Sequence, residues 1–449
     1  MERLDELLYT LGTLPHGYIS RKTIKGRVYT YLQYFHKGKI LSFYVPAAEL
    51  AEVEAKLAQR KEIEKEIKEL SAGFVEMPPL TKREKNFTGY LMCGDKVAAK
   101  LYKGEATSID EKLAPLYFRK SKDANAYFAN RVIDFNRANK KELLRALKIK
   151  DKDRSVIPLY VNGRSLTDNF WFKPSGAVTK YSDLRFGKNL YAGVAFDGLK
   201  REYPVGPGRT PEISTPGETE KCWRFEKNAW WMYKKETPDM VFVDTFVGLL
   251  AREMDIFTIR YTKVEEGVKT RNFAEKFNFE PFFGLVDRDD DYAGIFEFLA
   301  QFGKDAQKDF LRLLYLDAIT SNQDRTLNDM GLLRNKQTGD VLRLAPNFDN
   351  NRCMEDLSLR AVNDIKVRAF IEFIKSSKAV KKLFKKTKMR KVKKDMFKKL
   401  VYKSDPGAKR DFRIYRDSVM ERVEFIKKYL KKALPAMTIA VEEQRLKKQ

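Results

Sequence analysis

The sequence predicts an α+β fold with a strand-rich N-terminal part, a mostly helical C-terminal part and a small hairpin–helix module in front of both. Short alternating runs of apolar and polar residues indicate strands at residues 27–45, 90–102 and 221–233. After them, apolar residues recur at helical spacing over residues 239–255, which marks one buried face of a helix. Lysine-rich segments in residues 375–410 carry apolar residues at similar intervals, which indicates amphipathic helices.

A chain of 449 residues suggests roughly two to four domains, and we expect three parts. Residues 1–75 form an accessory module in which a β-hairpin precedes a long charged helix over residues 47–70, supported by Glu/Lys pairs four residues apart. Residues 85–262 form a strand-rich lobe and residues 263–449 a helical lobe. The prolines of residues 76–79 indicate a linker between the module and the rest.

The formal net charge of +26 at pH 7 favours acidic partners, such as nucleic acid or an acidic protein surface. The charge is densest in residues 375–410, on what we expect to be the outer faces of helices. Nucleic-acid binding by this basic C-terminal lobe is one hypothesis, and a solvated helical surface is the other. DNA binding by the N-terminal module is a further hypothesis, through a basic cluster of Arg21, Lys22, Lys25 and Arg27.

Cysteine and histidine are too few for a disulfide framework or a zinc site. The three cysteines, Cys93, Cys222 and Cys353, lie far apart in the sequence, and the two histidines are His16 and His36. No apolar run reaches the roughly 18 residues that a membrane-spanning helix needs, and the first residues lack the apolar core of a signal peptide. We therefore expect a cytoplasmic protein without a membrane partner.

The most informative stretch of the chain spans residues 314–350. Asp324 is followed five residues later by Asp329, with Asn328 just before it, and two short apolar strands then lead to Asp349. This layout is typical of a phosphotransferase, in which one carboxylate accepts the proton of the attacking hydroxyl and two later groups hold Mg²⁺ on the ATP phosphates. A polar surface loop followed by an ordinary hairpin is the alternative interpretation.

Upstream residues supply other parts that phosphoryl transfer needs. A loop rich in small and hydroxyl residues, at residues 214–219, leads into a strand, and the return strand ends on Lys234. A lysine at this place neutralises ATP phosphates, and Asp244 in the following helix is placed to orient it. Lys100 is a rival, because residues 97–100 mimic the lysine-bearing strand of protein kinases. We prefer Lys234, since no hydroxyl-rich loop precedes Lys100.

Four motifs follow one another along the chain. They are residues 165–173 (SLTDNFWFK), residues 214–223 with residues 231–234 (WMYK), residues 322–325 (NQDR) and residues 344–349 (LAPNFD). With these motifs in this order, the chain resembles the HipA-like family of serine/threonine kinases over residues 88–430. The resemblance implies a two-lobed, protein-kinase-like fold with a mostly helical C-terminal lobe.

Residue by residue, the resemblance implies Asp324 as the catalytic base, Asp349 as an Mg²⁺ ligand and Lys234 as the lysine on the ATP phosphates. The family usually has asparagine at the position of Asp329. Aspartate also binds Mg²⁺, which prefers oxygen ligands, so we predict that Asp329 and Asp349 hold the metal, with Asn328 as a further cofactor contact. The implied phosphate loop is residues 214–221, with nucleotide contacts from Ser214, Thr215, Gly217, Thr219 and Lys221.

In some family members a serine that opens the phosphate loop is autophosphorylated, which ejects the loop, and Ser214 matches that position. Two further residues depart from the family pattern. Thr326 stands where many relatives have histidine, and Asp244 is one methylene shorter than the glutamate that kinases tend to carry. The contact between Asp244 and Lys234 is therefore expected to be weakened or altered.

The sequence thus predicts an ATP- and Mg²⁺-dependent serine/threonine protein kinase of HipA-like type. The resemblance implies a role as the toxin of a toxin–antitoxin pair, neutralised by a separate DNA-binding antitoxin, and a protein substrate among translation components, including one that carries tRNA. Two alternatives stay open. One is a catalytically degenerate kinase fold that acts as a nucleic-acid-binding regulator, and the other is a kinase for a small molecule or lipid.

Overall fold

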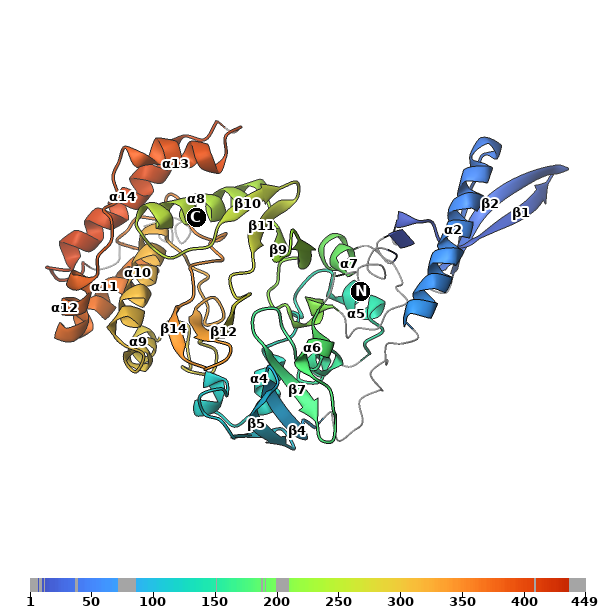
Figure 1. The fold of residues 1–449 in the computed structure, drawn as a ribbon. Coiled ribbons are helices and arrows are strands. Elements are labelled where there is room, and N and C mark those ends of the chain that lie inside the picture. The colour runs from blue at the N-terminus through green and yellow to red at the C-terminus, as the bar shows by residue number, and fades with distance from the viewer. Residues whose placement is uncertain are drawn as a thin grey trace, which may run out of the picture.

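The computed structural model describes residues 7–435 except residues 8–9, 12, 37–38, 72–85, 151, 187–188, 190, 199–209 and 408. Helices and sheets are mixed along the chain, with strands prominent in the first part and helices in the last (Figure 1). The predicted linker at residues 76–79 lies outside the described residues.

The N-terminal module is a three-stranded antiparallel sheet beside one long helix. Its elements are β1 (Tyr18–Ile24), β2 (Arg27–His36), β3 (Lys39–Tyr44) and α2 (Ala47–Ser71). Ile24 pairs with Arg27, so Lys25 and Gly26 form a two-residue turn, and both have the positive φ that such a hairpin turn requires. The hairpin predicted within residues 27–45 is therefore the second of two consecutive hairpins.

Residues 86–271 contain two four-stranded antiparallel sheets, with strand orders β6-β5-β4-β7 and β10-β11-β9-β8. The strands are β4 (Gly89–Cys93), β5 (Lys96–Tyr102), β6 (Glu105–Ser108), β7 (Phe170–Pro174), β8 (Lys221–Glu226), β9 (Ala229–Lys235), β10 (Tyr261–Val264) and β11 (Gly267–Arg271). The strands expected within residues 221–235 are confirmed as β8 and β9, and a turn at Lys227 and Asn228 joins them.

Short helices pack against both sheets, and those of the second sheet fix its position. The short elements are η1 (Leu116–Arg119), α4 (Ala124–Ala129), α5 (Lys140–Ala146), η2 (Ile157–Val161), α6 (Tyr181–Leu184), α7 (Ala192–Asp197) and η4 (Pro211–Ser214). Leu143 of α5 and Val194 of α7 share one buried cluster with Cys222 of β8 and Tyr233 of β9. Packing of this cluster holds the strand that carries Lys234.

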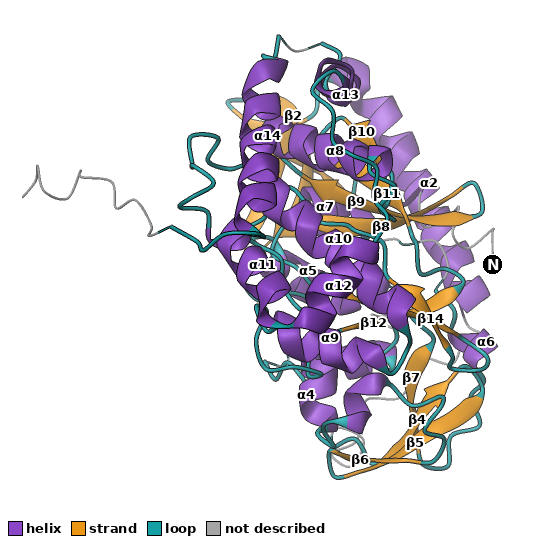
Figure 2. Ribbon diagram, turned by 90° about the vertical axis from the view of Figure 1, so that its left-hand side faces the viewer, coloured by secondary structure: helices purple, strands orange, loops and turns teal. Residues whose placement is uncertain are grey.

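The remaining elements are mostly helical. They are α8 (Pro238–Glu253), the sheet of β12 (Phe277–Pro281), β13 (Gly331–Asn335) and β14 (Val341–Leu344), and the helices α9 (Tyr292–Ala300), α10 (Lys304–Thr320), α11 (Ile365–Ser376), α12 (Lys378–Lys386), α13 (Met396–Ser404) and α14 (Phe412–Tyr429). Figure 2 shows α10, α11, α12 and α14 grouped together. The hairpin predicted between Asp329 and Asp349 is confirmed as β13 and β14.

The helical core includes α8, which corrects the predicted domain boundary. Phe246 and Leu250 of α8 are fully buried in one cluster with residues of α10, α11, α13 and α14. Helix α8 therefore packs with the helical part, although it was assigned to residues 85–262. The boundary between residues 262 and 263 also cuts β10, and the sheet resumes after α8 with β10 and β11, so sheet and helical core alternate along residues 238–271.

The lysine-rich segment forms the amphipathic helices that its pattern predicts. Val380 of α12 and Phe397 and Leu400 of α13 are buried, while Lys385 and Lys398 on the same helices are exposed. All three cysteines are buried and unpaired. In the described part of the chain, no helix is long and apolar enough to cross a membrane.

Candidate active site

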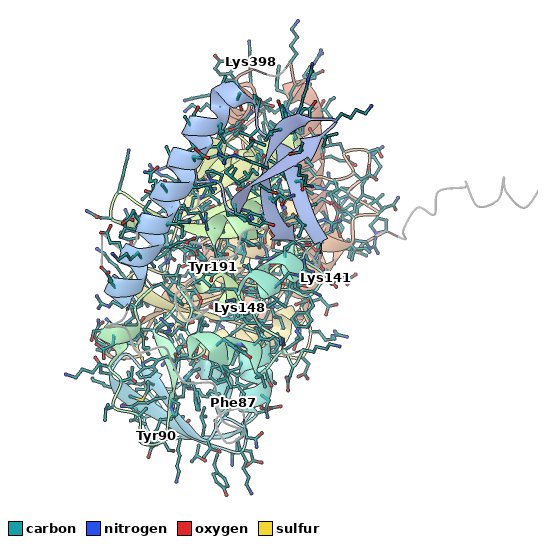
Figure 3. The ribbon with its side chains drawn as sticks, turned by 90° about the vertical axis from the view of Figure 1, so that its right-hand side faces the viewer. Phe87, Tyr90, Lys141, Lys148, Tyr191 and Lys398 are labelled. Atoms are coloured by element: carbon teal, nitrogen blue, oxygen red, sulfur yellow. The ribbon has the colours of Figure 1, made fainter. Side chains whose placement is uncertain are left out.

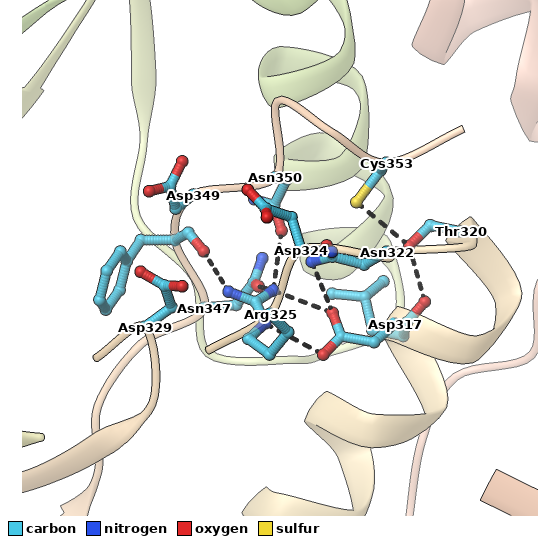
Figure 4. A network of polar contacts seen from close by, with 12 residues as sticks. Asp317, Thr320, Asn322, Asp324, Arg325, Asp329, Asn347, Asp349, Asn350 and Cys353 are labelled. Carbon is cyan, nitrogen blue, oxygen red and sulfur yellow. Dashed lines mark hydrogen bonds and ion pairs between the residues drawn. The ribbon is translucent and has the colours of Figure 1, made fainter. Parts of the chain in front are cut away.

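A buried arginine ties together the two segments that carry the predicted catalytic carboxylates. Arg325 donates two hydrogen bonds to Asp317 at the end of α10, at 3.0 and 2.9 Å. It also donates to the Phe348 carbonyl at 2.5 Å and to the Asn347 side chain at 2.8 Å (Figure 4). The loop after α10 and the loop after β14 are thereby held together, which brings Asp324 and Asp349 into one region.

Asp349 adopts a backbone conformation that is uncommon for a side-chain-bearing residue, with φ of 55°. Its N–H donates to the Tyr261 hydroxyl at 2.9 Å, and the next N–H, of Asn350, donates to Asp244 Oδ1 at 2.6 Å. The acceptors lie on β10 and α8, both before the predicted boundary at residue 262, so segments from the other side of that boundary fix how Asp349 is presented.

Lys234 Nζ donates to Asp349 Oδ1 at 2.5 Å. It also lies 2.8 Å from Glu236 Oε1 and 3.9 Å from Asp244 Oδ2. Burial alone would lower the pKa of Lys234, but the three carboxylates outweigh it and raise the pKa well above its ordinary value. Burial would raise the pKa of Asp349, yet Lys234 and Lys221 hold it below its ordinary value. Both groups are therefore charged at neutral pH.

The carboxylates of Asp329 and Asp349 lie on the same side of Arg325 (Figure 4). Asp329 accepts hydrogen bonds from the Thr326 N–H at 3.0 Å and its hydroxyl at 2.7 Å. Burial, and then the negative charge of Asp349, raise the pKa of Asp329 to about 6. Two neighbouring carboxylates that repel each other favour a divalent cation with oxygen ligands, so this donor set fits Mg²⁺.

Among the described residues, no group of three or more His, Cys, Asp or Glu side chains is arranged to hold a metal. Asp329 and Asp349 would therefore be the protein ligands of a Mg²⁺ ion, and phosphate oxygens and water would supply its other ligands, as is usual for this cation. The exposed amide of Asn328 pairs with that of Asn130, at 2.9 and 3.3 Å. A cofactor contact from Asn328 stays a prediction and requires this amide pair to open.

The predicted phosphate loop is clamped from one side by Arg137, which is 2% exposed. Its guanidinium donates to the carbonyls of Thr215 at 2.6 Å, Pro216 at 3.4 Å and Gly217 at 3.0 Å. Because the C=O and N–H of a trans peptide point in opposite directions, the N–H groups of Gly217 and Glu218 are turned away from Arg137. Such outward N–H groups are suitable donors to a phosphate.

Gly217 and Lys221 lie in close contact within this loop. Gly217 has φ of 106°, a conformation that side-chain-bearing residues rarely adopt, and a Cβ there would displace the end of the Lys221 side chain. Burial, reinforced by Lys234 and Arg137, lowers the pKa of Lys221 to about 8, although Asp349 opposes the shift. Lys221 is thus a second cation beside the carboxylate pair.

The loop's hydroxyl groups differ in how accessible they are. Ser214 is 4% exposed, and its Oγ donates to the Pro211 carbonyl at 3.2 Å. Thr215 Oγ1 donates to the same carbonyl at 2.8 Å and accepts the indole N–H of Trp223 at 3.0 Å, whereas Thr219 is half-buried. The predicted phosphorylation of Ser214 therefore requires the loop to leave this position.

Asp324 is exposed, unlike the predicted metal ligands Asp329 and Asp349, which are half-buried. Its N–H donates to Asn322 Oδ1 at 3.2 Å, which shapes the loop around it. Partial burial raises the pKa of Asp324; Arg352 opposes this, and Asp349 adds to it. The carboxylate is thus accessible to an incoming hydroxyl and is slightly more basic than an ordinary aspartate, which suits a proton acceptor.

Lys100, the rival lysine, lies on β5 in the other sheet and is exposed.

Three further residues of the site, Glu236, Arg137 and Arg325, had no role predicted from the sequence. Glu236 follows Lys234 by two residues in an extended segment, and this spacing, which places both side chains on one face, was a usable signal. Arg137 had no local signal, because it is 78 residues from the nearest carbonyl that it holds.

No protein-family model and no curated protein matches this chain. Among solved structures, it is similar to a Helicobacter pylori proinflammatory kinase, CtkA, at 12% identity and a TM-score of 0.30, over 46% of this chain and 90% of that one. It is also similar to the Shewanella oneidensis MR-1 toxin–antitoxin system HipA, solved with HipB and its operator DNA, at 12% identity and a TM-score of 0.49, over 76% of this chain and 99% of that one. Both likenesses are distant, so residue roles are argued from this chain's own geometry.

Replacing Arg137 with methionine removes the guanidinium that holds the phosphate loop. We expect ATP binding to weaken about tenfold or more, since each lost charged hydrogen bond to a buried carbonyl costs about 1–3 kcal/mol. The Kd for ATP with Mg²⁺, measured by calorimetry, checks this. Arg154→Met, at an exposed arginine that stacks on Phe135, is the matched control. A variant that melts earlier but binds ATP as tightly as the wild type would contradict a role in positioning the loop.

Glu212 is a buried carboxyl at the base of the same loop. It accepts the Trp223 N–H at 2.8 Å and a hydrogen bond from the Asn189 amide, and its Oε2 has no hydrogen-bond partner among the described residues. Burial raises the pKa of Glu212 from 4.5 to about 7. Folding therefore takes up a proton between these pH values, so stability is full below the lower value and falls as pH rises to the upper one.

Replacing Glu212 with glutamine keeps its acceptor oxygen and removes the titration. At pH 8 we expect Glu212→Gln to be more stable than the wild type by about 1–3 kcal/mol, and at pH 5 to differ little. Urea unfolding at both pH values measures the difference. Glu220→Gln, on a half-buried acid of the same loop, is the control. An advantage of equal size at both pH values would mean that Glu212 does not titrate as described.

Proposed function

We propose that this chain is an ATP- and Mg²⁺-dependent serine/threonine protein kinase of HipA-like type, with a two-lobed protein-kinase-like fold. One observation carries the proposal. Lys234, from β9, the second strand after the glycine-containing loop, meets Asp349, from the loop after the β13–β14 hairpin, at 2.5 Å. The two residues are 115 positions apart, and each is the residue that the sequence assigned to the nucleotide phosphates or their metal.

The order of the parts supports the same proposal. A loop that presents N–H groups precedes a strand with a buried lysine, and a helix with an acid follows. An exposed aspartate then lies after a long helix, and a hairpin leads to a second aspartate. Phosphoryl transfer depends mainly on positioning and on neutralising charge, and these parts supply both.

Each residue has a role that follows from its surroundings. Lys234, Lys221 and the outward N–H groups of the loop would hold the nucleotide phosphates, and Asp329 with Asp349 would hold Mg²⁺. When bound, Mg²⁺ would neutralise the charge on the β- and γ-phosphates. Asp324 accepts the proton of the incoming hydroxyl, and its exposure gives access to a side chain of another protein.

Glu236 takes the place that Asp244 was expected to fill as the partner of Lys234. Its carboxylate lies about one ångström closer to the lysine, at 2.8 Å against 3.9 Å. Asp244 is bonded instead to the Asn350 N–H. We infer that Glu236 orients Lys234, while Asp244 supports the backbone of the metal-binding loop.

The proposal extends to partners as the family resemblance implies them. The substrate would be a translation component, and the lysine-rich helices α12 and α13 suit one that carries tRNA, because every charged residue within them is a lysine. A cognate DNA-binding antitoxin would neutralise the kinase. The cytoplasm is the expected compartment.

The test is transfer of the labelled γ-phosphate of ATP by the purified chain with Mg²⁺, first to itself and then to a protein extract. We expect Asp324→Asn to lower the rate by about 10²- to 10⁴-fold, the usual effect of losing a general base. Asp290→Asn, on an exposed aspartate paired with Arg288, is the control and should be unchanged.

Mapping the labelled residue then distinguishes the alternatives. Label on a serine or threonine of this chain or of an extract protein supports a protein kinase. Label confined to a metabolite or lipid fraction indicates the small-molecule alternative. A folded wild type that neither binds nor turns over ATP contradicts the proposal and leaves the nucleic-acid-binding regulator.

A further inference from the structure

The N-terminal module has an unusual charge distribution. No aspartate or glutamate occurs in residues 7–48, whereas six lysines and arginines lie between residues 17 and 48. Carboxylates resume with Glu49 in α2. The sheet therefore carries positive charge that no acid on its own strands offsets, which favours a polyanion as its partner.

Strand register places tyrosines and a lysine on one face of this sheet. Lys22 of β1 pairs with Tyr29 of β2, and Tyr31, two residues further along β2, pairs with Tyr44 of β3. Paired residues, and residues two apart on a strand, point to the same face. The Tyr44 ring centroid lies 6.2 Å from that of Tyr29 and 6.0 Å from that of Tyr31, and Lys22 Nζ lies 5.3 Å from the Tyr31 centroid.

Other residues of this face continue the same chemistry. By the same register, Tyr18 of β1 and Arg27 of β2 share it. Tyr18 and Tyr44 are more than half exposed, at 53% and 57%. We call the face formed by Tyr18, Lys22, Arg27, Tyr29, Tyr31 and Tyr44 the tyrosine face.

The opposite face of the sheet is turned to the helix. Arg21 alternates with Lys22 and therefore lies on that face, and its guanidinium is 3.6 Å from Glu54 of α2. The sheet lies at the front of the view in Figure 3 with α2 beside it. The tyrosine face is thus the one that α2 leaves open.

Aromatic rings on neighbouring strands, flanked by cations, form a surface on which nucleic-acid bases stack. Bases in single strands offer their π-faces to such rings, whereas bases within a duplex are stacked on one another. A duplex would also need an element that enters a groove, and the flat tyrosine face provides none. The chemistry therefore favours a single strand over a duplex.

We propose that the tyrosine face binds single-stranded nucleic acid, with bases stacked on Tyr29, Tyr31 and Tyr44 and phosphates held by Lys22 and Arg27. This site does not depend on the proposed kinase activity. Stacking and phosphate contacts are the same for DNA and RNA, so the experiment below shows which of the two binds more tightly.

Fluorescence anisotropy of the full-length chain with labelled oligo(dT), oligo(U) and a duplex, each of about 20 nucleotides, tests this proposal. We expect a single strand of at least one sugar type to bind about tenfold or more tightly than the duplex. Combining Tyr31→Leu with Tyr44→Leu should weaken binding of the single strand at least tenfold, since each ring lost removes a stacked base. Leucine keeps apolar volume on the strands, so the module retains its packing.

Tyr102→Leu is the matched control, because Tyr102 is also 57% exposed and has Lys103 Nζ 5.3 Å from its ring centroid, but lies on β5. Tyr102→Leu should bind the single strand as tightly as the wild type.

Replacing Lys385 and Lys386 of α12 with glutamate tests the other basic surface. The proposal would be overturned if the lysine variant lost single-strand binding while the tyrosine variant kept it. Equal affinity for duplex and single strand would overturn it as well. Phosphoryl transfer measured in parallel should be unchanged in the tyrosine variant, which separates this proposal from the kinase assignment.

Discussion

The buried pair of Arg325 and Asp317 is the interaction on which the candidate site depends. The Arg325 guanidinium donates two hydrogen bonds to the Asp317 carboxylate at the end of α10, and another of its N–H groups donates to the Phe348 carbonyl in the loop that carries Asp349. A buried pair of this kind contributes little net stability, but removing one partner costs about 3–5 kcal/mol, because the other charge is left unpaired. The pair therefore acts as a geometric constraint: Asp324 is adjacent to Arg325 in the chain, and Asp349 is adjacent to the carbonyl that Arg325 binds.

A second constraint is the balance of charge around Lys234. The chain carries a formal charge of +26, yet this site gathers Glu236, Asp244, Asp329 and Asp349 around Lys234 and Lys221. Burying several carboxylates together is unfavourable unless cations compensate them. Burial raises the pKa of Asp244 well above its ordinary value and that of Asp329 to about 6, so these carboxyl groups resist ionising together unless a further cation, such as a divalent metal ion, compensates them. This is why a metal-dependent reaction on phosphates suits the site better than anion binding alone.

Much of the fold and part of the site could be predicted from the sequence, because the signals were local. The alternation in β8 and β9 and the helical spacing of α8 are visible within about 20 residues. The positions of Asp324, Asp329 and Asp349 follow from a hairpin of ordinary length. Lys234 was chosen over Lys100 from the loop that precedes it, and the structure brings Lys234, not Lys100, to Asp349.

What the sequence did not predict depends on contacts between distant segments. The clamp by Arg137 joins residues that no periodicity connects, and its burial gives no sequence signal. The packing of α8 with the helical core was missed because an amphipathic pattern identifies a buried face but not the surface that covers it. The pairing of β1 with β2 was also missed, although the two-residue turn at Lys25 and Gly26 that joins them is a local signal.

The most direct test of the central claim is calorimetric titration of the full chain with ATP, with and without Mg²⁺, comparing the wild type with Lys234→Met and Lys100→Met. If Lys234 and the carboxylate pair form the nucleotide site, binding requires Mg²⁺. Lys234→Met, shown by circular dichroism to be folded, should then bind at least about tenfold more weakly, since it loses a charged contact worth about 1.5–3 kcal/mol. Lys100→Met should match the wild type. Loss of binding in Lys100→Met with full binding in Lys234→Met would contradict the account.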